Sequence, residues 1–167
     1  MTPLKYLSAY PEELQSQIQL LIEKQELGQY LLARYPTTHS CNNDKQLRIF
    51  VMALKNQHLK RSAPLSKIEF NTKLHVINNA LGTHSYITRV QGKKLKTTNE
   101  IRISSLFKKV PEAFLNMIVV HELAHIKEKD HSAEFYKLCR YMLPDYHQLE
   151  FDLRVYLTAL DLGLTLY

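Results

Sequence analysis

The chain has 167 residues, of which 45% are hydrophobic and 23% charged, and these values are ordinary for a domain that buries its own core. Its two cysteines, Cys41 and Cys139, are too few for a disulfide-rich secreted scaffold, so reduced thiols and a cytoplasmic location are expected. We find no signal-peptide pattern and no apolar stretch near the roughly 20 residues of a membrane helix. No membrane partner is therefore expected.

The net charge of +6 is unevenly distributed along the chain. Residues 43–109 contain 14 Lys and Arg against 3 Asp and Glu, a net of +11, and the remainder contains 8 against 13, a net of −5. This asymmetry predicts an anionic partner such as a nucleotide, a nucleic acid or an acidic peptide, and the alternative is a solvated lysine-rich surface. The candidates for a substrate-binding rim of cations are Arg89, Lys93, Lys94, Lys96 and Arg102.

The N-terminal part of the chain, residues 1–64, is predicted to form a helical arm. Pro11 begins a helix whose apolar residues recur at helical spacing, and Pro36 ends it. A second helix is expected to begin at Asn43 or Asp44, since both are good N-terminal caps, and to end before residue 64.

The next part, residues 65–109, is predicted to form a small, mostly antiparallel sheet. Asn and Gly residues separate its short runs as turns, and Gly92–Asn99 is expected to be a basic, polar loop. The runs with β-branched or aromatic content are Ile68–Phe70, Leu74–Ile77, Tyr86–Val90 and Ile101–Ser104.

Three helices are predicted in the rest of the chain. Pro111 begins the first, which is apolar almost all round from Ala113 to Val120 and should therefore lie at the centre of the domain. The second is expected from about Ser132 to Met142 and the third after Pro144. The expected fold class is α+β, with a helical arm over 1–64 and one compact domain over 65–167.

The central helix contains the motif His121-Glu122-Leu123-Ala124-His125. Two histidines four residues apart share a helix face and lie about 6 Å apart along the axis, so both imidazoles can bind one metal ion. Glu122 is rotated by about 100° from His121 and can face a water molecule instead of the ion. Two core histidines beside a surface glutamate are the alternative, which costs several kcal/mol in unpaired polar groups inside an apolar helix.

A catalytic zinc site needs a third protein ligand and one open position. His131 can supply this ligand if the chain turns back after the helix, and Glu150 on the last helix is the alternative. His131 would otherwise be an ordinary loop histidine. The ion would lower the pKa of its bound water toward about 7, and Glu122 would act as general base. The expected metal is Zn²⁺, or Mg²⁺ if the substrate is a nucleotide.

Ligand histidines usually donate their second ring N–H to a carboxylate or a carbonyl group. The candidate carboxylates for this role are Glu134, Glu150 and Asp152.

The segment VVHELAHIKEKDHSAEFY, Val119 to Tyr136, resembles the signature of the YgjP-like metal-dependent hydrolases. The resemblance covers essentially the whole chain, including the C-terminal LPDYHQLEFDLRVYLTAL, and is close to the short bacterial members. It implies a zincin-like minimal metallopeptidase core, more distantly similar to SprT-like proteases that act on DNA-linked proteins. It also implies that the metal ligands are His121, His125 and His131 and that the catalytic residue is Glu122.

The chain departs from larger relatives of this family in one respect. Many of these relatives carry a Trp-Gly-Ser stretch before the last strand of the sheet, whereas this chain has no Trp and has Ser85–Val90 in that region. Details of substrate binding therefore cannot be carried over at this place.

Three functions stay open at this point. The first is a zinc hydrolase that cleaves peptide bonds, with the substrate added as a strand at an edge such as Ile101–Ser104. The second is a nucleoside triphosphate pyrophosphatase acting on UTP, an activity described for some YgjP-like proteins, in which Lys and Arg would hold the phosphates. The third is a non-enzymatic nucleic-acid-binding module. The sequence leaves the oligomeric state undetermined.

Overall fold

The fold combines a small sheet with helices, which confirms the α+β class. The computed structural model describes the backbone of residues 4–73, 82–91 and 94–167, and the side chains of 4–73 and 99–167. The elements in chain order are η1 (Lys5–Leu7), α1 (Glu12–Glu23), α2 (Leu27–Arg34), α3 (Asp44–His58), β1 (Leu65–Asn71), β2 (Gly82–Gln91), β3 (Lys94–Ser104), η3 (Ser105–Lys109), α4 (Glu112–Ala124), α5 (Ala133–Met142) and α6 (Tyr146–Asp161). None of the described helices is long and apolar enough to cross a membrane.

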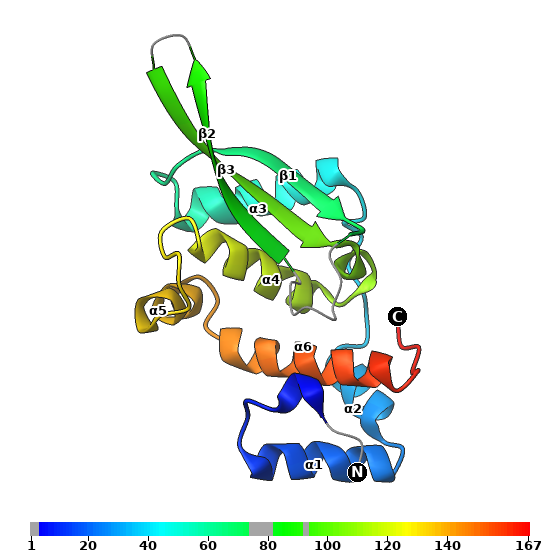
Figure 1. Cartoon of the computed structure of the whole chain (residues 1–167). Helices are drawn as coiled ribbons and strands as arrows, with labels where there is room; N and C mark the ends of the chain where they lie inside the picture. The colour runs from blue at the N-terminus through cyan, green and yellow to red at the C-terminus, as the bar shows by residue number, and fades with distance from the viewer. Residues whose placement is uncertain (1–3, 74–81, 92–93) are drawn as a thin grey trace.

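The three strands of the described residues form a mixed sheet in the order β1-β3-β2 (Figure 1). β2 and β3 form an antiparallel hairpin, in which Gly82 pairs with Ile103 and Gln91 with Lys94. β1 runs parallel to β3, with Ile68 opposite Ile101. β3 is therefore the central strand, and β1 and β2 are the edges.

This topology corrects three predictions. The sheet is not mostly antiparallel, because β3 inserts between β1 and β2 and takes up a parallel pairing with β1. Ile101–Ser104 is not an edge, since it pairs on both sides and leaves no backbone groups for a substrate strand. Most of Gly92–Asn99 is strand and not loop, because residues 94–99 pair with β2. The predicted strand Leu74–Ile77 lies outside the described residues.

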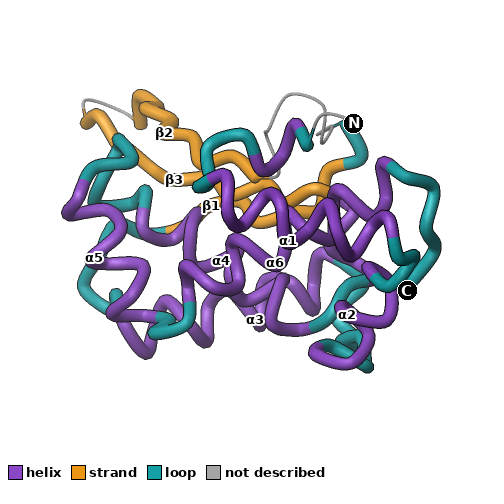
Figure 2. The backbone as a smooth tube through the Cα atoms, turned by 90° about the horizontal axis from the view of Figure 1, so that it is seen from below, coloured by secondary structure: helices purple, strands orange, loops and turns teal. Residues whose placement is uncertain are grey.

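The helix α4 lies between the sheet and α6, and this arrangement confirms the predicted central helix. α3 packs against β1 and α4 against β2 and β3, so both helices cover one face of the sheet (Figure 2). On its opposite side α4 packs against α6, which in turn contacts η1 and α2. Nine residues of α4 are buried, and they point to every side of the helix.

The first part of the N-terminal arm contains two helices, α1 and α2, where the sequence predicted a single helix from Pro11 to Pro36. α1 ends at Glu23, and Gln25 takes a left-handed backbone conformation with φ of 59°. The amide of Glu26 donates to the carbonyl of Leu21 at 2.8 Å, which is the bond of a Schellman cap. A non-glycine residue closes this cap, so no glycine marked the break in the sequence.

The helix α3 begins as predicted. The side chain of Asn43 accepts a hydrogen bond from the amide of Gln46 at 2.9 Å and caps the helix. The carboxylate of Asp44 accepts a hydrogen bond from the amide of Phe70 at 2.9 Å, which links the start of α3 to β1.

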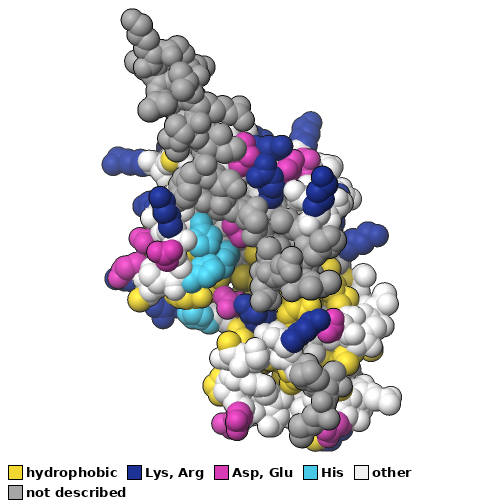
Figure 3. All heavy atoms as spheres, in the orientation of Figure 1, with side chains coloured by type: hydrophobic (Ala, Val, Ile, Leu, Met, Phe, Trp, Pro, Cys, Tyr) yellow, Lys and Arg dark blue, Asp and Glu magenta, His cyan; other side chains and the backbone are white. Residues whose placement is uncertain are grey.

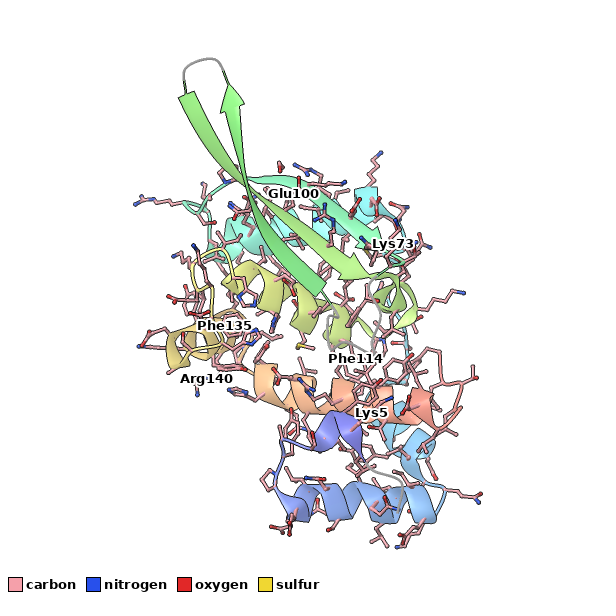
Figure 4. The ribbon with its side chains drawn as sticks, viewed as in Figure 1. Lys5, Lys73, Glu100, Phe114, Phe135 and Arg140 are labelled. Carbon is pink, nitrogen blue, oxygen red and sulfur yellow. The ribbon has the colours of Figure 1, made fainter. Side chains whose placement is uncertain are left out.

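We expect Phe114→Ala to lower the free energy of unfolding by about 3–5 kcal/mol, because the side chain is fully buried and its removal leaves a cavity. Phe114 lies between α4 and α6 (Figure 4), and its ring packs against Tyr35 and Tyr156. The control is Ile49→Ala, because Ile49 is 65% exposed and its replacement should change the free energy of unfolding by no more than about 0.5 kcal/mol. Urea denaturation of the two variants and the wild type measures both changes. Equal losses in the two variants would contradict the central place of α4.

Candidate metal centre

The C-terminal end of α4 and the turn after it bring three histidines together. His121 lies in the last turn of α4, and His125 is the residue at which the helix ends. The amide of Glu128 donates to the carbonyl of Ala124 at 3.0 Å, so the chain folds back on itself directly after the helix. Ser132 then caps α5 by accepting from the amide of Phe135 at 3.2 Å. His131 is thereby held next to the end of α4. The chain turns back after the helix, as a third ligand at His131 would require.

The three imidazoles point their Nε2 atoms at one another. The Nε2 of His131 lies 3.1 Å from that of His125 and 3.2 Å from that of His121. One nitrogen of each ring lies within 4.8 Å of the others, a grouping that could hold a metal ion. Histidine side chains gather at this place on the molecular surface (Figure 3). Glu150 is not a member of this group among the described residues.

The spacing of these nitrogens fits a tetrahedral ion. Zn–N bonds of about 2.0–2.1 Å at tetrahedral angles separate the ligand nitrogens by about 3.3 Å, close to the two short distances here. Three ligands leave a fourth position open, as catalytic zinc sites require. Three imidazole ligands also match the preference of zinc better than that of magnesium, which favours oxygen ligands. The residues present therefore fit a divalent ion of the zinc type.

The second ring nitrogens of His121 and His125 are held by neighbouring groups. The Nδ1 of His125 lies 2.9 Å from the backbone oxygen of Glu128, to which its N–H donates. The Nδ1 of His121 lies 2.7 Å from the hydroxyl of Tyr146 on α6. Both contacts orient the rings so that Nε2 faces the centre of the cluster.

The partners of the histidines differ from those considered from the sequence. A main-chain carbonyl and a tyrosine hydroxyl take the place of the carboxylates that were considered. Asp152 is fully buried and instead accepts from the hydroxyl of Tyr35 and pairs with Arg34 at 3.2 Å, which joins α6 to α2. Tyr146 was missed because its hydroxyl reaches His121 only through the packing of α6 against α4, which no sequence spacing encodes.

An aromatic ring from α5 supports the cluster. The ring centroid of Phe135 lies 5.0 Å from that of His121, 4.5 Å from that of His125 and 4.9 Å from that of His131. The side chain lies between α5 and α4 (Figure 4). Phe135 therefore forms an apolar wall that restricts the rings and excludes water from one side of the cluster.

Burial keeps His121 and His125 neutral. It lowers the pKa of His121 to about 3, helped by the neighbouring His125 and His131, and it also lowers the pKa of His125. A neutral imidazole has a free lone pair on one ring nitrogen, which is the form that binds metals.

The motif glutamate follows His121 in α4 and is not a surface residue. Glu122 is only 2% exposed, and burial raises its pKa to about 8. A buried carboxyl group with a raised pKa close to neutral is the kind of group that can both accept and return a proton in a hydrolytic reaction.

The residues predicted to form a cationic rim are not brought together at the histidines by any described contact. Arg102 binds Glu69 at 3.0 Å and Glu100 at 2.9 Å on the sheet. Arg89 pairs with Lys96 in the hairpin, and Lys94 pairs with Gln91 near its end, which extends past the helices (Figure 1). The side chains of these three residues, and all of Lys93, lie outside the described part of the chain.

The comparison with known proteins assigns the chain to a family. The family described as "YgjP-like, metallopeptidase domain" matches residues 92–156, which contain the three histidines and Glu122. The protein "UTP pyrophosphatase" of Escherichia coli is 53% identical over 163 residues, which is 98% of each chain. The chain belongs to the YgjP-like family. This family membership makes it a metal-dependent hydrolase with a zincin-like core, as its sequence indicated.

A second relative is more distant. "Protein SprT" of Vibrio parahaemolyticus is 31% identical over 83 residues, 49% of this YgjP-like chain and 42% of the relative. No solved structure matches the chain significantly.

We expect Tyr146→Phe to weaken metal binding by about 10- to 100-fold, because the variant loses the hydroxyl that orients His121. Competition with a chromogenic chelator measures the affinity. The control is Tyr141→Phe on α5, whose side chain is 68% exposed. The same affinity in both variants would show that the hydroxyl has no part in holding the ligand.

Proposed function

We propose that this YgjP-like protein is a zinc-dependent nucleoside triphosphate pyrophosphatase that acts on UTP. The observation that carries the proposal is the cluster of His121, His125 and His131, together with the buried Glu122 that follows His121 in α4. The substrate follows from the near full-length similarity to a protein named UTP pyrophosphatase. The net charge of +11 in residues 43–109 also suits a triphosphate better than it suits an uncharged peptide.

The proposed reaction converts UTP and water into UMP, pyrophosphate and a proton. A bound zinc ion supplies Lewis-acid charge and lowers the pKa of water. His121, His125 and His131 would hold it, with Tyr146 and the Glu128 carbonyl fixing two of the rings. Magnesium would accompany the triphosphate, whose oxygens it prefers, and not the imidazoles.

Glu122 would move the proton. The water oxygen bonds to the α-phosphorus, and the bond from this phosphorus to the oxygen bridging the α- and β-phosphates breaks. Pyrophosphate leaves with the electron pair, while the proton of the water passes to Glu122 and then to solvent or the leaving group. The apolar wall of Phe135 limits access of further water on its side of the site.

A peptidase is the second candidate, and the sheet topology favours it. Among the described strands β2 is an edge that packs against α4, so an extended peptide could pair with β2 along this edge. The description of the matching family as a metallopeptidase domain agrees with this reading.

Pyrophosphate release from UTP, CTP, ATP and GTP tests the proposal on zinc-loaded protein with and without magnesium. We expect UTP to be hydrolysed and Glu122→Gln to lose about 10²-fold or more of the rate, because the general base is absent. Glu112→Gln is the matched control, since it makes the same change at an exposed position of the same helix.

A second variant separates metal binding from proton transfer. His131→Ala should lose activity together with bound zinc, whereas Glu122→Gln should keep its zinc by elemental analysis. Release no faster than in Glu122→Gln for every nucleotide would overturn the pyrophosphatase. Cleavage of unfolded protein by the same preparation would then identify the peptidase. A salt-dependent DNA complex that survives chelator, with neither activity, would identify a binding module.

A further inference from the structure

A pocket of about 370 Å³ lies beside the metal centre and has no role in the proposed chemistry. Its volume is in the range of sites that hold small molecules. It lies between the segment after η1, α5 and α6, and its lining residues are Ala9, Tyr10, Tyr136, His147, Glu150 and Arg154.

The pocket shares a wall with the histidine cluster. The ring of Tyr136 lies 6.3 Å from the ring of His131 and 5.4 Å from that of His147. It also lies 6.3 Å from the ring of Tyr146, whose hydroxyl holds His121. A molecule in the pocket would therefore be adjacent to a group reacting at the metal centre.

Two aromatic rings on this wall offer faces for stacking. Tyr136 and His147 lie with their rings at 33°, so neither ring stacks fully on the other. Aromatic faces of this kind bind the flat faces of nucleobases. A planar, conjugated ligand group therefore suits this side of the pocket.

The polar groups of the pocket comprise one acceptor, the carboxylate of Glu150, and two donors, Arg154 and Tyr10. Glu150 and Arg154 lie one turn apart on α6, with 4.0 Å between Oε1 and Nε, longer than a hydrogen bond. The Nη1 of Arg154 donates to the carbonyl of Tyr6 at 3.3 Å, which anchors the guanidinium. Burial, together with the charge of Glu150, raises the pKa of Tyr10 to about 12, so its hydroxyl stays a donor at neutral pH.

We propose that this pocket binds the uracil base of the substrate, with Glu150 accepting from N3–H and with Arg154 and Tyr10 donating to the two carbonyl oxygens. The inference rests on the proposed function, because it assigns the base-binding part of that same substrate. The Watson–Crick edge of uracil presents an acceptor, a donor and an acceptor. It therefore needs two donors and one acceptor from the protein, and Arg154, Tyr10 and Glu150 supply this set.

The same arrangement rejects cytosine. Cytosine has a lone pair at N3, which would face the carboxylate of Glu150, and an amino group that would face a donor. Polar groups left unpaired in a site built to hydrogen-bond the correct ligand give strong discrimination. Glu150 is thus the residue on which the choice of pyrimidine depends.

The position of the pocket agrees with the reaction. Pyrophosphate release requires attack at the α-phosphorus, and only the ribose separates this phosphorus from the base. The base must therefore bind beside the metal centre, where Tyr136 and His147 place it.

Calorimetric titration of UMP and CMP, with and without zinc, tests the pocket without any catalysis. These nucleotides differ only in the base, so their affinity ratio reports base recognition alone. We expect wild-type protein to bind UMP at least tenfold more tightly than CMP. Glu150→Gln should reduce this ratio at least tenfold, because the glutamine amide can turn its N–H toward N3 of cytosine.

Glu13→Gln, an exposed position on α1, is the control and should keep the wild-type ratio. Equal affinities for UMP and CMP in wild type, no measurable UMP binding, or a ratio unchanged in Glu150→Gln would each overturn the inference. Discrimination between UMP and CMP without any pyrophosphate release from UTP would keep the pocket and reject the pyrophosphatase. Pyrophosphate release from UTP without discrimination between UMP and CMP would keep the pyrophosphatase and reject the pocket as the uracil site.

Discussion

The burial of α4 on every side is the constraint on which the rest of this structure depends. The helix is apolar nearly all round, so one partner layer cannot shield it from water. The sheet covers one side and α6 the other, and α2 and η1 pack against α6 in turn. The N-terminal helices thus cover the far side of α6, and the segment after η1 comes to line the pocket beside the metal centre.

The same burial explains the chemistry available at the end of α4. Glu122 and His121 belong to a helix that the fold removes from water, so both favour their uncharged forms. A metal ion bound by the three imidazoles would compensate for this desolvation and lower the cost of a charged Glu122. The burial that stabilises the fold therefore also prepares the site for a cation.

Local sequence patterns predicted the strands of the sheet but not their order. The runs around Ile68, Ile87 and Ile101 were correctly expected as strands, because alternation and turn residues are local signals. Their order was not predicted, because the hairpin folds back so that its second strand lies in the centre. The choice of neighbour for β1 depends on the packing of the whole core, in which α3 lies on β1 and α4 lies on β2 and β3. The break at Gln25 was missed for a related reason, since a Schellman cap without glycine leaves no mark in the sequence.

The sequence by itself determined the family, the buried central helix and the four residues of the candidate site. It could do so because His121, Glu122 and His125 are related by the period of one helix and His131 by a short turn. Only the tertiary structure decided that Tyr146 and the Glu128 carbonyl hold the rings of His121 and His125. It also decided that Glu150 lines a pocket apart from the histidine cluster, and that Tyr10 reaches that pocket. These contacts join residues from separate elements, and their distances follow from how α6 packs against α4 and the N-terminal segment.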